Sequence, residues 1–403
     1  MAAQPRQTDP SVESVSALET DDSPGTGRFA YQPAFDGLRA IAVLLVMGFH
    51  VGVVALVVNV PGGWLGVDVF FVLSGYLITT LLLRERERRG RVNLPNFYAR
   101  RTLRLAPLVT VLVAGALVLH ETGAAPRLGV TPLGAVSILA YFSNWVFIRH
   151  LSALGILAHC WSLSIEEQFY LVWPALLLVA GAALSQRRRL ALAGLVTCGI
   201  VAMTLYRRHV WLAALGWNRH NPFAYGLLRP HRYHVWAYLF ASTFTRPDGL
   251  LFGCLLALLL SGTRVPTRTV RVAVGVIGVG AFLAGGVLIY RAGSSPYPNF
   301  VPLWGLTLLN CCTTLVVAHL VLSPRAGLAR LLSVRPLTWV GRRAYGIYLL
   351  HPIVLAAITE YGHLLGWGGF TVALIATLAL AGASYRWFEQ PFLRRKARFS
   401  ADS

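Results

Sequence analysis

Long apolar windows recur along this chain and restrict the folds open to it. Several windows reach about 18 residues or more, the length that a bilayer demands of a helix. Of the 403 residues, 56% are hydrophobic and 13% are charged, whereas soluble domains carry about 25% charged residues. The sequence therefore predicts an all-α, multi-pass membrane protein.

Clusters of arginine separate the apolar windows and indicate how the chain crosses the bilayer. Cytoplasmic loops carry an excess of Lys and Arg, so the basic clusters at 84–104, 187–189 and 325–343 are expected on the cytoplasmic side of a plasma membrane, in a bacterium. The alternation predicts about ten membrane helices with both termini in the cytoplasm. The expected spans are about 38–58, 64–83, 104–120, 163–184, 190–208, 248–262, 270–290, 302–322, 344–360 and 368–388.

One apolar stretch, residues 133–149, breaks this alternation. If it crossed the bilayer fully, the cluster at 187–189 would lie on the outer side. We therefore expect this stretch to be re-entrant or to lie on the outer surface. The alternative is a topology of eleven spans.

The ends of the chain are polar and are expected to lie outside the membrane domain. Residues 1–31 are rich in Ser, Thr, Asp and Pro, lack the apolar core of a secretory signal, and are predicted to be a disordered cytoplasmic tail. The membrane domain is expected over 32–395 and a second cytoplasmic tail over 396–403. We expect no soluble domain after it.

The formal net charge of +20 raises the question of nucleic acid. The arginines concentrate in short loops between apolar windows, which is the pattern of membrane topology, so no nucleic-acid partner is expected. The five cysteines follow no metal-ligand spacing and most lie in apolar runs. We therefore expect neither a metal site nor disulfides.

The first apolar span carries Arg39 at its entrance and His50 deep inside. Eleven residues of helix bring the chain back to within about 20° of its starting direction and advance it by about 16 Å. Both side chains are therefore expected on one helix face, with Asp36 one turn before Arg39. Ionisable groups in a membrane helix are costly and usually face a cavity or a partner. A desolvated histidine suits a general base; the bland alternative is a buried histidine bonded to a neighbouring helix.

Two adjacent acids, Glu166 and Glu167, enter a later apolar span. Neighbouring residues point about 100° apart on a helix, so one is expected to face the interior and the other an interface. Ser162 and Ser164 lie at spacings that allow a capping box. Capping accounts for one acid better than for two.

Two further patterns are a pair of small residues in the second apolar span and a group of arginines at the start of the third. Ser74 and its neighbour Gly75 allow close approach of helices, which packing alone explains. Arg101 and Arg104 are three residues apart on one helix face and follow Arg100. They either anchor the helix at the membrane surface or form a fork for phosphates, which guanidinium geometry suits.

The stretch at about 209–246 is expected to be a long outer loop, rich in aromatic residues. It either holds an acceptor over the mouth of a cavity or forms an interfacial aromatic belt. Its aromatic residues of interest are Trp211, Trp217, Tyr225, Tyr233 and Trp236.

Together these strings resemble the acyltransferase 3 family of membrane O-acyltransferases. The resemblance covers about residues 32–395, and Ala344 stands where Ser is expected. The matching strings are Phe35 to Arg39 with His50, then residues 66–78, 97–107, 159–170, 246–253, 341–352 and 389–392.

The resemblance implies transfer of a short acyl group, acetyl or another, from acyl-CoA to a hydroxyl, with acyl-CoA as a co-substrate rather than a resident cofactor. His50 would be the base or a transient acyl carrier, and Glu167, with Glu166 as second choice, would fix its tautomer. The residues implied in chemistry are His50, Arg39, Glu167 and Asp36. Those implied in acyl-CoA binding are Arg100, Arg101, Arg104, Tyr98 and Ser74. Those implied in the acceptor cavity are Trp161, Ser162, Glu166, Tyr170, Arg246, Asp248, Tyr348 and His351.

The implied acceptor is a sugar on a cell-surface glycan or glycolipid, or a glycosylated natural product such as a macrolide. The competing hypothesis is a transporter or flippase that uses His50 and Glu167 as a proton relay. Consumption of acyl-CoA distinguishes the two, because a transporter releases no free thiol.

Overall fold

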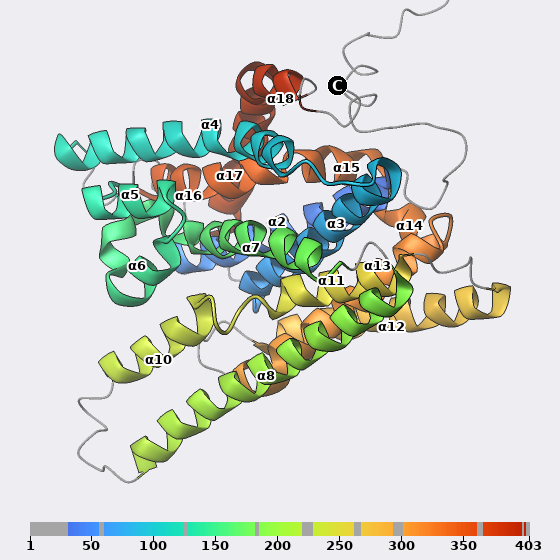
Figure 1. The fold of residues 1–403 in the computed structure, drawn as a ribbon. Helices are drawn as coiled ribbons and strands as arrows, with labels where there is room; N and C mark the ends of the chain where they lie inside the picture. Colours follow the sequence, from blue (N-terminus) through green and yellow to red (C-terminus); the bar gives the residue numbers. More distant parts are fainter. Residues whose placement is uncertain are drawn as a thin grey trace, which may run out of the picture.

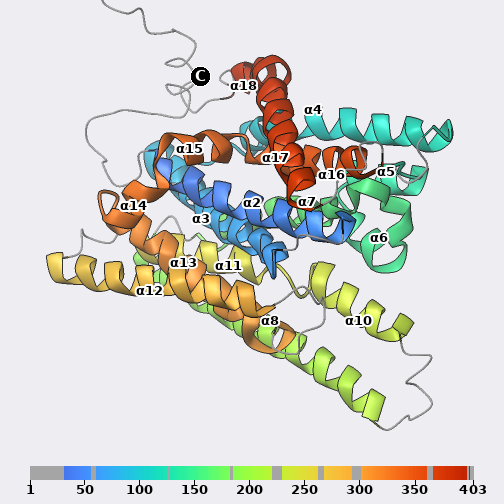
Figure 2. The same ribbon diagram turned by 180° about the vertical axis from the view of Figure 1, so that it is seen from behind.

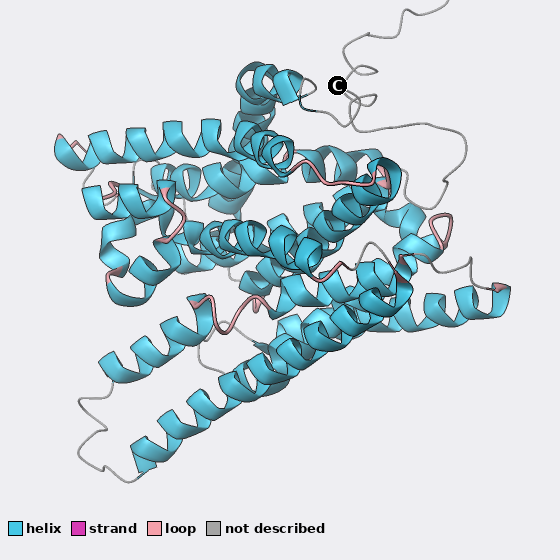
Figure 3. Ribbon diagram, in the orientation of Figure 1, coloured by secondary structure: helices cyan, strands magenta, loops and turns pink. Residues whose placement is uncertain are grey.

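A computed structural model describes residues 31–55, 60–124, 128–181, 185–219, 229–261, 267–292, 301–360, 366–396 and 399. All regular secondary structure in these ranges is helical, and they contain no strand (Figure 3). Most of the two predicted tails, 1–30 and 400–403, lies outside the described residues.

The helices follow one another with short connections (Figure 1). The helices that begin before residue 200 are α2 (Pro33–Ala55), the 3₁₀ segment η1 (Gly63–Leu65), α3 (Gly66–Arg89), α4 (Leu94–Glu121), α5 (Pro132–Leu139), α6 (Ser143–Arg149), the 3₁₀ segment η2 (Leu151–Cys160), α7 (Trp161–Val179) and α8 (Gln186–Arg219). The rest are α10 (Arg229–Ala241), α11 (Asp248–Leu260), α12 (Arg268–Ala292), η3 (Val301–Gly305), α13 (Leu306–Leu322), α14 (Gly327–Leu332), α15 (Arg335–Arg342), α16 (Ala344–Glu360), α17 (Gly366–Ala383), η4 (Ser384–Glu389) and α18 (Gln390–Lys396).

Each predicted span coincides with one of these helices. Seven helical segments of the described chain are long and apolar enough to cross a bilayer: those that contain α2, α3, α4, α8, α12, α13 and α17. Helices α11 and α16 are shorter and apolar. Exposed aliphatic side chains, such as Val276 on α12 with 70% of its surface accessible, suit contact with lipid. The protein is a multi-pass membrane protein, while the count of ten spans stays a prediction.

The stretch 133–149 forms two short helices, α5 and α6, each of eight residues or fewer. A helix of eight residues is about 12 Å long, so neither can cross the apolar core of a bilayer alone. Thr131 begins α5 by accepting a hydrogen bond from the backbone N–H of Gly134 at 3.2 Å. The re-entrant or surface position of this stretch stays a prediction.

The prediction that residues 209–246 form a long loop is wrong. Helix α8 continues to Arg219, and α10 covers Arg229–Ala241, so most of the segment is helical. Trp211 is buried, and Trp236 stacks on Phe240 with ring centroids 4.5 Å apart. Tyr225 and the side chains of Trp217 and Tyr233 lie outside the described part. Aromatic content alone could not distinguish a loop from packed helices.

Helices α3 and α11 pack with their backbones in contact. A Cβ on Gly75 would lie 1.9 Å from the carbonyl oxygen of Leu250, and a Cβ on Gly253 would lie 2.1 Å from that of Val72. Only glycine fits at both positions, as in close helix pairs in membranes. The predicted packing role of the small residue at Gly75 is confirmed.

The first turn of α2 is held by a polar clamp. Asp36 accepts hydrogen bonds from Tyr31 and, at 2.8 Å, from Arg39; Arg342 of α15 donates to the Tyr31 hydroxyl at 2.9 Å. Burial, with the nearby Asp36 carboxylate, raises the pKa of Tyr31 to about 12, so the hydroxyl keeps its proton. The clamp fixes the start of α2 against α15, which lies beside it in Figure 2.

Candidate functional site

Three histidines from separate elements meet at the far end of α2. His50 of α2 and His351 of α16 have ring centroids 4.9 Å apart, and His159 at the end of η2 lies 5.5 Å from His351 and 6.3 Å from His50. His159 and His351 are buried, whereas His50 is partly exposed. Of the three, His50 is therefore the imidazole best placed to meet a substrate.

The hydrogen bonds define the tautomer of His50. Its Nδ1 lies 2.8 Å from the carbonyl oxygen of Val46, which only accepts, so Nδ1 carries the proton. By the same reasoning Nδ1 of His351, 3.0 Å from the carbonyl of Ile347, carries a proton. The Nε2 of His351 is then a lone pair, 3.3 Å from Nδ1 of His50. Nε2 of His50 makes no hydrogen bond to any described residue and is left as the basic nitrogen.

Tyr348 and Ser162 extend this histidine group. The Tyr348 hydroxyl donates to the carbonyl oxygen of His159 at 2.7 Å and lies 2.7 Å from the Ser162 hydroxyl. Burial, followed by the charge of His50, lowers the pKa of His159 to about 3, so that this ring is neutral near pH 7. The structure thus brings together Ser162, Tyr348, His351 and His50 among the expected residues, and adds His159.

The two acids of α7 have different partners. Glu166 accepts hydrogen bonds from the hydroxyls of Ser74 and Tyr170. Glu167 lies 3.0 Å from the guanidinium of Arg101, which also stacks 3.4 Å over the Tyr170 ring. Neither acid caps α7, which begins without a side-chain cap.

The expected pairing of Glu167 with His50 is not formed in the structure. The described hydrogen bonds of the His50 ring go to Val46 and His351, and Glu167 pairs with Arg101 instead. Sequence spacing within one helix could not reveal this choice, because each partner comes from another helix.

Tyr98 has a structural task that its sequence context did not reveal. Pro174 lacks an N–H, so the carbonyl of Tyr170, four residues earlier in α7, loses its usual partner. The Tyr98 hydroxyl lies 3.3 Å from that oxygen and 3.2 Å from the carbonyl oxygen of Leu171. It therefore satisfies backbone groups at the proline in α7.

The three arginines of α4 have different surroundings. Arg101 is committed to Glu167, whereas Arg100 donates to the carbonyl oxygen of Phe399 at 2.6 Å and lies 3.6 Å from Glu85. Arg104 is exposed. Of the three, Arg104 is the one whose guanidinium is open to a ligand.

Asp36 and Arg39 lie in the clamp at the base of α2. Fourteen residues of helix separate Asp36 from His50, or about 21 Å. Both groups therefore act on the placing of α2 rather than on the atoms next to His50.

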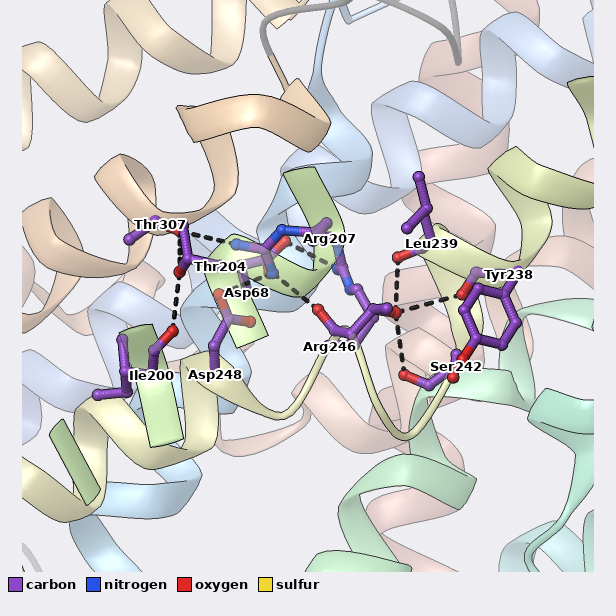
Figure 4. A network of polar contacts seen from close by, with 11 residues as sticks. Asp68, Ile200, Thr204, Arg207, Tyr238, Leu239, Ser242, Arg246, Asp248 and Thr307 are labelled. Carbon is purple, nitrogen blue, oxygen red and sulfur yellow. Dashed lines mark hydrogen bonds and ion pairs between the residues drawn. The ribbon is translucent and has the colours of Figure 1, made fainter. Parts of the chain in front are cut away.

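Arg246 and Asp248 belong to a buried network of four charges (Figure 4). Arg246 pairs with Asp68 at 3.0 Å, and Arg207 pairs with Asp248 at 2.9 Å. All four side chains have 0% exposure. Arg207 also donates to the carbonyl oxygen of Thr245 at 2.7 Å. The network joins α3, α8 and the start of α11. The role of Arg246 and Asp248 in an acceptor cavity stays a prediction.

Trp161 packs beside this network, among aromatic side chains of α6 and α10. Its ring lies 4.6 Å from that of Phe240 and 6.1 Å from that of Phe147, and the guanidinium of Arg246 lies 5.4 Å from its centroid. The side chain is buried.

Sequence reasoning missed three participants. Arg207 and Asp68 are charges inside apolar windows, a signal that could have marked each of them as a member of a buried ion pair. His159 stands within one of the recognised strings, and its position directly before α7 was the available sign.

Comparison with known proteins supports the sequence resemblance. The model of a family described as an acyltransferase domain matches residues 32–386 of the chain. No solved structure matches it.

Curated relatives carry names of the same kind. The chain is 33% identical to a putative peptidoglycan O-acetyltransferase of Bacillus subtilis, over 91% of this chain and 55% of that protein. It is 32% identical to a peptidoglycan O-acetyltransferase of Listeria monocytogenes, over 90% of this chain and 56% of that protein. A putative O-acetyltransferase of Staphylococcus aureus is 31% identical, over 91% and 58%. The chain thus spans about half the length of the curated relatives it matches.

Proposed function

The chain belongs to the acyltransferase family whose model covers residues 32–386, and we propose that it is a membrane O-acyltransferase with His50 as its base. It transfers a short acyl group, acetyl in the simplest case, from acyl-CoA to a hydroxyl. The observation that carries this proposal is the free Nε2 of His50, which the Val46 carbonyl and His351 leave as a lone pair. The protein acts in the plasma membrane.

The reaction follows from this nitrogen. The acceptor hydroxyl loses its proton to Nε2 of His50 while its oxygen attacks the thioester carbonyl carbon. A C–O bond forms, the C–S bond breaks, and the thiolate of coenzyme A leaves and takes up the proton from Nε2 of His50, which restores the neutral base. The charge that develops on the imidazole is offset by the single Nδ1–H, which is shared between the carbonyl oxygen of Val46 and Nε2 of His351.

A second route uses the same nitrogen as a nucleophile. Nε2 attacks the thioester, the acyl group resides on His50, and the acceptor hydroxyl then displaces it. Incubation with labelled acetyl-CoA and no acceptor distinguishes the routes, since only the second route leaves label on the protein.

The relatives' names favour a glycan as the acceptor. Two of them are named as peptidoglycan O-acetyltransferases, which supports a sugar hydroxyl of a cell-surface glycan over a macrolide. For the donor, the exposed Arg104 is the candidate for the phosphates of coenzyme A, because Arg101 is already paired with Glu167. The transporter hypothesis needs a proton relay between His50 and Glu167, and the pairing of Glu167 with Arg101 argues against such a relay.

Replacement of His50 tests the function. His50→Gln keeps hydrogen bonding but provides no basic nitrogen, so acetyl transfer should fall by about 10²- to 10⁴-fold. The assay measures free thiol and acetylated glycan with the purified, full chain in proteoliposomes. The matched control is His209→Gln, which changes an exposed histidine on α8.

Retention of more than a few per cent of activity by His50→Gln would refute His50 as base. Absence of acyl-CoA consumption by the wild-type protein, with every glycan acceptor offered, would refute the acyltransferase function itself.

A further inference from the structure

A basic pocket lies at the end of the molecule opposite the histidines, between the start of α12 and the end of α13. Its volume is about 540 Å³. Figure 2 shows α12, α13 and α14 together at this end, beside the start of α2, whereas His50 lies toward the other end of α2. The lining residues include Arg268, Arg271, Arg325 and His319, none of which belongs to the proposed active site.

The positive charges of the three arginines in the pocket are not balanced by carboxylates of the described residues. Their guanidinium groups form no ion pair or hydrogen bond with the residues that the structure describes, and no acidic side chain lines the pocket. In contrast, Arg101 and Arg207 are each paired with a carboxylate. The pocket therefore has a positive lining with no counter-charge from the described protein.

His319 is the second, independent observation. Its side chain is 2% exposed, and neither ring nitrogen has a hydrogen-bond partner among the described residues. Buried polar groups without partners are uncommon, because they cost free energy unless a ligand or water satisfies them. An imidazole that lines a basic pocket with both nitrogens unpaired points to a ligand.

The helix facing His319 is shaped to admit its ring. A Cβ on Gly278 would lie 2.4 Å from Cβ of His319, and a Cβ on Gly275 would lie 3.6 Å from its Nδ1. Glycine at these positions of α12 lets the imidazole stand in the pocket wall. The placement of His319 is thus built into both helices.

We propose that this pocket binds a phosphate-bearing anion. Guanidinium groups bind phosphate oxygens through paired N–H donors, and two of these groups, those of Arg268 and Arg271, come from the first turn of α12. His319 donates a further hydrogen bond. The phosphate comes either from a lipid headgroup or from solution.

The residues around the pocket favour a lipid headgroup as the source of the phosphate. The pocket lies at the basic end of an apolar helix, where Val272 and Val276 are exposed on the next turns. An anionic lipid would place its phosphate among the arginines and its chains along those side chains.

The test measures lipid binding by the full chain in detergent after delipidation, by native mass spectrometry. Phosphatidylglycerol should bind at least tenfold more tightly than phosphatidylcholine. Arg268→Gln/Arg271→Gln should abolish that preference. The matched control, Arg187→Gln/Arg188→Gln, removes two exposed arginines from the first turn of α8 and should leave it unchanged.

A second variant and a soluble probe complete the test. His319→Leu should raise the melting temperature without ligand and weaken phosphatidylglycerol binding at least fivefold. Competition by millimolar inorganic phosphate assigns the site to a soluble phosphate, and its failure to compete assigns it to the lipid. Equal binding of both lipids together with no effect of inorganic phosphate, or equal loss in the α12 and α8 variants, overturns the proposal.

Discussion

His159 shows how one buried side chain can make the stability of the protein depend on pH. Its ring is packed against Tyr348 and His351, and its Nδ1 has no partner among the described residues. Burial lowers its pKa to about 3, whereas an unfolded chain leaves a histidine near 6.5. Between these values only the unfolded state takes up the proton.

We therefore predict that the free energy of unfolding falls as the pH drops from about 6.5 toward about 3. One proton contributes at most about 1.4 kcal/mol per pH unit. Chemical denaturation of the purified protein at a series of pH values measures the slope, and His159→Gln should flatten it. Equal slopes for the two proteins would exclude His159 as the source.

At the scale of elements, the contact of α3 with α11 depends on the absence of side-chain atoms. Gly75 and Gly253 each face a backbone carbonyl of the other helix. The α3 residue Ser74, directly before Gly75, reaches Glu166 of α7. The same close contact thus holds α3 where it can bond to α7.

Gly75→Ala should destabilise the protein by about 1–3 kcal/mol, because the added Cβ forces two backbones apart. Gly286→Ala is the control, since a Cβ there meets nothing within 4 Å and alanine favours helix. Thermal unfolding in detergent compares the two. If the Gly75→Ala and Gly286→Ala variants have the same melting temperature, the close approach of α3 and α11 contributes little to stability.

At the scale of the whole molecule, the four buried charges connect helices that are far apart in sequence. Asp68 begins α3, Arg207 lies in the second half of α8, and Asp248 begins α11. Their charges balance as two ion pairs (Figure 4). Breaking one pair leaves a buried charge alone, which costs more than removing both members.

Arg246→Leu should therefore destabilise the protein by about 3–5 kcal/mol, through the unpaired Asp68. The double variant Arg246→Leu/Asp68→Leu should recover part of that loss. Melting temperature and the yield of monodisperse protein measure both. A double variant less stable than the single would show that the network acts by more than charge balance.

Hydropathy was sufficient to place the long apolar helices, because a span in lipid needs a long apolar run wherever it packs, but it did not reveal α10, which was predicted as part of a loop. The partners of the charged residues were not predictable in the same way. Glu167 and Arg101, and likewise Arg246 and Asp68, come from different helices. Which charges meet is decided by helix packing, to which one sequence gives no direct access. The strings around His50 and His351 located the site, while the tautomer required the distances.

The clamp at the start of α2 determines where His50 lies along the helix axis. A Cβ on Gly37 would lie 1.8 Å from the carbonyl oxygen of Leu332, and one on Gly341 would lie 1.8 Å from that of Asp36. The base of α2 therefore cannot sink or turn without moving α14 or α15. Each residue of helix adds about 1.5 Å along the axis and a rotation of about 100°. The contacts at the start of α2 therefore fix both the position of His50 along the helix axis and the direction in which its side chain points. A substitution in this clamp should thereby change the position of His50, nearly four helical turns away.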